Sequence, residues 1–144
     1  MSGPYDPPKS VVADAAPAVR EKPAQVRRAV TMLWLSLGLG VANLLIEPRL
    51  LGEEEGWMSL LMAGVSFAIV AGLTAGISAG YNWARIVFLI LFVIGFIPYL
   101  FILREMVALS AVAGVLSVVQ EVLQFGALFL VFTKPGSLWF RKDR

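Results

Sequence analysis

The chain has 144 residues, of which 58% are hydrophobic and 15% are charged, and its formal net charge is +2. Soluble domains carry about 45–50% apolar and about 25% charged residues, so this composition indicates an integral membrane protein. The chain has no cysteine and no histidine, which excludes disulfides, thiolate chemistry and imidazole metal ligands. So small a net charge gives no reason to expect a nucleic-acid partner.

Residues 1–28 differ from the rest because they hold five of the eight prolines and no long apolar run. We interpret them as a flexible, Pro-rich cytoplasmic tail. A signal peptide is not expected, because Arg27 and Arg28 come late and the apolar run after them is longer than a usual h-region. The "PYDPPK" motif in this tail has two interpretations, a disordered segment or a docking peptide.

Four stretches with little or no charge follow the tail, each close to the roughly 20 residues that a helix needs to cross the hydrocarbon core. We predict transmembrane helices at about 29–50, 57–80, 84–104 and 109–132. Strands are not expected, because no period-2 alternation is present and lipid leaves no water for unpaired backbone groups. The predicted fold class is all-α, an integral membrane four-helix bundle over residues 29–132, followed by a basic-aromatic cytoplasmic tail at 133–144.

The basic residues predict the orientation. If the N-terminus is cytoplasmic, only Arg49 and Arg104 of the 12 basic residues lie on the outer side. Because cytoplasmic loops of membrane proteins carry an excess of Lys and Arg, we expect both termini inside the cell.

Aromatic side chains gather near the predicted membrane interfaces. Trp57 and Trp83 flank predicted spans, and the ending "SLWFRKDR" places Trp139 and Phe140 beside Arg141. Aromatic belts and basic residues of this kind anchor helices at the headgroup level. We interpret these residues as interfacial anchors, with a specific lipid head-group site as the alternative.

Small residues recur at every fourth position of the second predicted helix: Gly64, Ala68, Gly72, Gly76 and Gly80. Such a stripe lets another helix backbone approach closely, which drives association in lipid. We expect the contact to be with another helix of the same chain, and a helix of a second copy is the alternative.

Polar residues also share faces on the first and fourth predicted helices. Ser36, Gly40, Asn43 and Glu47 lie at helical spacing on the first. At 100° per residue, five polar side chains of the fourth fall within an arc of about 100°. These residues, which we call the polar ridge, are Ser110, Ser117, Gln120, Glu121 and Gln124. We expect the ridge to face the bundle interior or a partner.

Glu121 is the only charged residue in the fourth predicted span. An ionised carboxylate at mid-membrane costs at least ~2.5 kcal/mol, and no Lys or Arg lies in the uncharged interior of a predicted span to pair with it. We therefore expect a protonated, neutral Glu121 at pH 7, with Gln120, Gln124 and Asn43 as amide partners, so that it ties the fourth helix to the first. Three roles remain open: glue between helices, a proton or cation site, and contact with a partner membrane protein.

Three motifs resemble those of a widespread group of uncharacterised small bacterial four-helix inner-membrane proteins. "GPYDPPKS" is similar to their "NPYAPP" opening, "GYNWARIVFLILFVIG" to the start of their third helix, and "FLVFTKPGSLWFR" to their W-F-R ending. Gln120 or Gln124 matches a glutamine common in their last helix. The chain departs from the group at Tyr81, where a basic residue is frequent, and at Asp6. The resemblance implies a bacterial cytoplasmic membrane and the four-helix layout, and it implies no activity.

We therefore predict a multi-pass inner-membrane protein with a structural, accessory or partner-binding role, with no catalysis of its own, no cofactor and no metal site. Its expected partners are the lipid bilayer and either a second copy of the chain or another membrane protein. The alternative is a small proton- or cation-coupled transporter or channel, oligomeric, that uses Glu121 as the coupling group. Small multidrug-resistance transporters are similar in size and also have a single glutamate within the membrane. They place it in the first helix, whereas Glu121 lies in the fourth.

Overall fold

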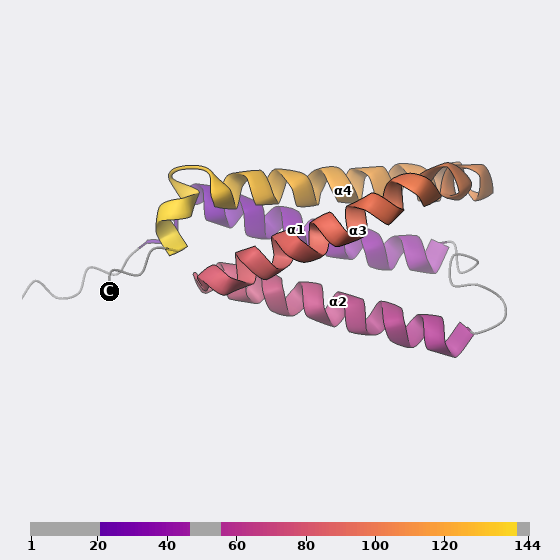
Figure 1. Ribbon diagram of the computed structural model, residues 1–144, viewed down its shortest axis with the longest axis horizontal. Helices are drawn as coiled ribbons and strands as arrows, with labels where there is room; N and C mark the ends of the chain where they lie inside the picture. The colour runs from indigo at the N-terminus through magenta and orange to yellow at the C-terminus, as the bar shows by residue number, and fades with distance from the viewer. Residues whose placement is uncertain (1–20, 47–55, 141–144) are drawn as a thin grey trace, which may run out of the picture.

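The computed structural model describes residues 21–46 and 56–140. Within them the chain folds into α1 (Ala24–Ile46), α2 (Gly56–Ser78), α3 (Asn82–Leu109), α4 (Ala111–Phe132) and a short 3₁₀ helix, η2 (Gly136–Phe140) (Figure 1). All four α-helices are long and apolar enough to cross a membrane. The all-helical class and the presence of four helices of membrane-spanning length are thus confirmed within the described residues. Glu47, Arg141 and most of the predicted N-terminal tail lie outside the described residues.

The first helix begins earlier than expected. It starts at Ala24, inside the range 1–28 that was predicted to be tail, and so includes Arg27 and Arg28. The amide of Arg27 donates the first helical bond to the carbonyl of Pro23, and Val26 is fully buried against the other helices. The uncharged run that begins at Ala29 indicates only which residues cross the hydrocarbon. The helix itself begins earlier, because Val26 packs in the core.

The third helix is longer than expected, and only Ser110 separates it from α4. α3 continues past Arg104 to Leu109, where Ser110 adopts an extended backbone that ends it. The Ser110 hydroxyl then accepts a hydrogen bond from the amide of Ala113, at 3.3 Å, and so caps the start of α4. Ser110 is therefore a capping residue at the corner between two helices.

The core lies toward one end of the bundle, the end at which α1 begins and α4 ends; we call it the terminal end, and the end near Ile46 and Gly56 the far end. The most extensive contact is between α1 and α4. The core cluster includes Leu33 of α1, Ile77 of α2 and Val131 of α4. Figure 1 shows α2 and α3 meeting at the terminal end and diverging toward the far end, where α3 crosses to α4.

This divergence divides the small-residue stripe of α2. Gly76 and Gly80 are buried, and a Cβ on Gly76 would come within 2.8 Å of the Ala84 Cβ. Gly64, Ala68 and Gly72 are exposed, and a Cβ on Gly64 or Gly72 would meet nothing within 4 Å. The expected packing on another helix of the chain is found at Gly76, which lies against Ala84, whereas Gly80 follows α2 and packs on Trp139 of η2. Within the described residues the expectation is wrong for the other three, because α3 leaves α2 before reaching them.

The chain after α4 folds back onto the terminal end of the bundle. The Gln25 side chain holds this turn: its Oε1 accepts from the amide of Gly136 at 2.9 Å, and its Nε2 donates to the carbonyl of Lys134 at 3.4 Å. The Arg85 guanidinium lies over the rings of Phe132 and Phe140, 5.0 and 4.6 Å from their centroids. η2 is therefore part of the packed structure.

Two of the predicted membrane anchors turn inward as a result. Phe140 is only 4% exposed and belongs to the core cluster. Trp139 packs on Gly80, whose φ of +84° and lack of a side chain leave room for the indole. The anchor prediction is thus wrong for Phe140, whereas Trp57 and Trp83 are exposed, as anchors should be. The inward turn depends on contacts with Gln25 and Arg85, which are distant in sequence.

Candidate functional site

The polar ridge of α4 faces the inside of the bundle, as expected. Ser117 is buried and Gln120, Glu121 and Gln124 are half-buried. Valines on the opposite face of α4 are exposed, among them Val115, Val119 and Val122. The helical period therefore determines which side of α4 is available for polar contacts.

Ser117 connects α4 to α3. Its hydroxyl donates to the carbonyl of Gly114 at 2.8 Å and lies 3.4 Å from the Tyr99 hydroxyl. The pair places a hydrogen bond between two helices where no water is expected. Tyr99 was not among the predicted site residues. The available signal in the sequence was its hydroxyl group, which lies in the otherwise apolar stretch before Arg104.

Asn43 connects α1 to α4, but at a different level from Glu121. Its Nδ2 donates to the carbonyl of Ala113 at 3.4 Å, and its Oδ1 is buried without a partner among the described residues. Asn43 therefore does not serve as the amide partner that was predicted for Glu121. Ser36, Gly40 and Asn43 do share one face of α1, as predicted, and all three are buried.

Gln120 lies against α1. A Cβ on Gly40 would come within 3.2 Å of the Gln120 Oε1 and 3.0 Å of the Phe67 Cε1, so the amide occupies the space that the missing side chain leaves. Gln120 lines a cavity of about 130 Å³ between α1, α2 and α4, together with Ser36 and Ser66. Both hydroxyls donate to carbonyls of their own helices, so toward the cavity they are hydrogen-bond acceptors.

Glu121 faces a second cavity, of about 160 Å³, on the other side of the ridge. The walls of this cavity come from α2, α3 and α4: Val70, Phe88, Leu91, Phe92, Gly95, Phe96, Glu121 and Gln124. The prediction that Glu121 ties α4 to α1 is wrong. One residue along a helix is a rotation of about 100°, so Gln120 points to α1 and α2 while Glu121 points to α3.

Gln124 lines both cavities, as does Val70. The ridge thus places a carboxyl and two carboxamides around two small adjacent cavities in the bundle, and we call this arrangement the polar seam. Within residues 21–46 and 56–140, the Glu121 side chain makes no hydrogen bond or ion pair, and no cluster of three His, Cys, Asp or Glu residues is present to hold a metal ion. The seam can therefore offer a proton, hydrogen-bond donors and acceptors, and a carboxylate to a small guest.

Comparison with known proteins gives no match: no family model, no curated protein and no solved structure is significantly similar to this chain. The interpretation of the seam accordingly rests on its geometry.

The polar seam should contain water, because polar cavities of this size hold ordered waters. The chain has no cysteine, so single-cysteine variants report on one position each. We expect Gln124→Cys to react with a small water-soluble thiol reagent about tenfold faster than Val122→Cys, since the reactive thiolate forms in contact with water. Val122 is the matched control because it lies on the lipid-facing side of the same helix. Equal reaction rates would contradict a hydrated seam.

Proposed function

We propose that this chain is a multi-pass membrane protein with an accessory or partner-binding role, which binds a transmembrane helix of its partner on the exposed face of α2. One observation carries this proposal: Gly64, Ala68 and Gly72 form a small-residue surface on which no other helix of the described part of the chain lies.

The two halves of the stripe support this interpretation. At Gly76 the stripe already accepts the start of α3 at close range, since a Cβ there would overlap Ala84. The exposed half has the same spacing and the same small residues. Apolar side chains gain nothing from leaving lipid for another helix, so helix association in a membrane depends on close backbone packing of this kind. A second copy of the chain or another membrane protein would supply the missing helix.

The proposed location is the bacterial inner membrane, with both termini in the cytoplasm. The resemblance to small bacterial four-helix membrane proteins supports the membrane, and the positions of the described cations support the orientation. Lys22, Arg27, Arg28 and Lys134 lie beside the ends of α1 and α4 at the terminal end, whereas Arg104 lies near the far end of α3.

A leucine at Gly72 tests the proposed interface. We expect Gly72→Leu to abolish copurification with the partner helix while the melting temperature in mild detergent stays within about 2 °C of the wild type, because the site is open within the chain. Two differently tagged copies expressed together, followed by pull-down and mass spectrometry, distinguish self-association from another partner.

The matched control is Gly76→Leu, one turn along the same helix. It should destabilise the protein by about 1–3 kcal/mol, because the new side chain overlaps Ala84. If Gly72→Leu retained every wild-type association, or if the wild type had none in native membranes, the proposed role would be rejected.

A second candidate function is proton or cation coupling at Glu121. It is favoured by the cavity that this carboxyl lines and by the lack of any hydrogen-bond partner for it among the described residues. An intramembrane carboxyl in this situation is a common proton site.

The substitution Glu121→Gln separates the two candidates, since it keeps the size and hydrogen bonding of the side chain and removes its proton. Coupling predicts proton-linked flux in wild-type liposomes that falls to the level of empty liposomes in the variant. A partner-binding role alone predicts no flux in either. Flux that survives the substitution unchanged would exclude Glu121 as the coupling group.

A further inference from the structure

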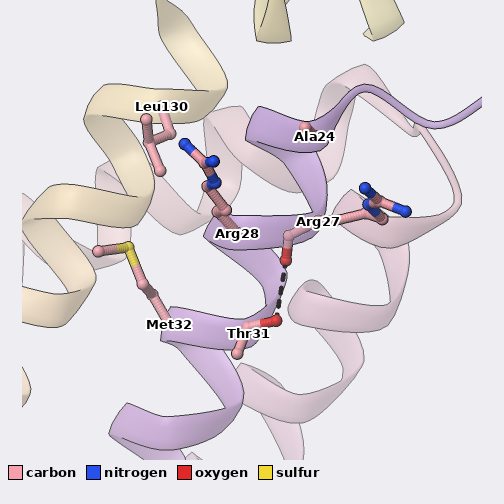
Figure 2. Close-up of a pocket in the computed structure, with 6 residues that line it drawn as sticks. All are labelled: Ala24, Arg27, Arg28, Thr31, Met32 and Leu130. Atoms are coloured by element: carbon pink, nitrogen blue, oxygen red, sulfur yellow. Dashed lines mark hydrogen bonds between the residues drawn. The ribbon is translucent and has the colours of Figure 1, made fainter.

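A groove with a basic rim lies between α1 and α4 at the terminal end of the bundle (Figure 2). It has a volume of about 550 Å³ and is larger than either cavity of the polar seam. Its lining comes from one face of α1 and from one residue of α4: Ala24, Arg27, Arg28, Thr31, Met32 and Leu130. In Figure 2 the Arg28 side chain extends toward Leu130, whereas the Arg27 side chain extends in the other direction, away from Leu130.

The two arginines of this rim differ from the other cations nearby. Lys22 donates to the Ser78 hydroxyl at 2.6 Å, and Arg85 is held by Asn82, by the Val131 carbonyl and by two aromatic rings. The guanidinium groups of Arg27 and Arg28, in contrast, make no hydrogen bond or ion pair with any residue of the described part of the chain. Two such arginines at the rim of one groove favour an anion there, and a guanidinium group suits above all one that accepts paired hydrogen bonds, such as a phosphate.

The rest of the lining is apolar. Met32 lies close to α4, because a Cβ on Gly126 would come within 3.4 Å of its terminal methyl group. Leu130 lies across the groove from it, and the Thr31 hydroxyl is already bonded to the carbonyl of Arg27 at 3.0 Å. The groove therefore changes from charged to apolar within about one turn of α1.

The position of the groove along the helix matches the depth of a lipid head group. α1 carries no charge from Ala29 to Ile46, so Arg27 and Arg28 lie where the hydrocarbon span begins. Basic residues at this depth attract anionic lipids, and basic pockets between transmembrane helices bind their head groups. A soluble phosphate would use the basic rim only, whereas a phospholipid would also cover Met32 and Leu130.

We propose that this groove binds one anionic glycerophospholipid, with its phosphate at Arg28, with Arg27 adding positive charge at the rim, and with an acyl chain along Met32 and Leu130. The site does not depend on the exposed face of α2 or on Glu121, and it holds a lipid against the contact between α1 and α4.

Native mass spectrometry of the full chain in detergent, titrated with phosphatidylglycerol or phosphatidylcholine, tests this site. We expect the wild type to bind the first phosphatidylglycerol at least about tenfold more tightly than phosphatidylcholine, because each basic residue near the head group adds attraction. The double variant Arg27→Gln/Arg28→Gln should lose that preference. Both side chains are exposed, so the fold should persist, and thermal unfolding of the variant checks this.

The matched control is Arg104→Gln/Lys134→Gln, which removes the same charge from exposed side chains outside the groove. It should keep the wild-type preference for phosphatidylglycerol. Addition of excess inorganic phosphate should not displace the bound lipid. The proposal is overturned if the two double variants lose the preference equally, if Arg27→Gln/Arg28→Gln keeps it, if the wild type has none, or if inorganic phosphate alone displaces the lipid.

Discussion

The contact between α1 and α4 is the interaction on which the rest of the bundle depends. In hydrocarbon no water is available to pair with polar groups, so amide and hydroxyl side chains must be placed between helices. The buried face of α1 and the polar ridge of α4 meet this requirement together: Gln120 occupies the space beside Gly40, and Asn43 donates to the Ala113 carbonyl. Because α4 is fixed in rotation by these contacts, Glu121 must turn toward α3.

The two ends of the bundle differ in how they are held. At the terminal end, Gln25 and Arg85 hold the turn after α4, and Phe140 completes the core. At the far end α2 contributes no buried residue before Leu73, because α3 has crossed to α4. Within the described residues the terminal end is therefore firmly packed, and the partner helix proposed above would lie on the uncovered part of α2.

Much of this architecture could be predicted from local sequence properties, and the parts that could not depend on distant residues. Hydropathy is enough to locate four spans, and the 100° helical repeat is enough to place the polar ridge on one face of α4. The inward position of Phe140 depends on Arg85, and the division of the small-residue stripe depends on the direction in which α3 crosses. Asn43 was mispredicted as an amide partner of Glu121 because the sequence does not fix how far α1 and α4 are shifted along each other, and Asn43 lies level with Ala113. The groove between α1 and α4 was missed because Arg27 and Arg28 were assigned to a tail, whereas they belong to α1.

The account requires that α4 crosses the membrane with its polar ridge inside the bundle and its two ends on opposite faces. Cysteine labelling in cells tests this most directly, because the chain has no cysteine of its own. Leu109→Cys and Lys134→Cys are exposed positions beyond the two ends of α4. A membrane-impermeant thiol reagent should label Leu109→Cys in intact cells and Lys134→Cys only after the membrane is permeabilised. Labelling of both positions from the same side would contradict a spanning α4, and labelling of Lys134→Cys alone in intact cells would reverse the orientation.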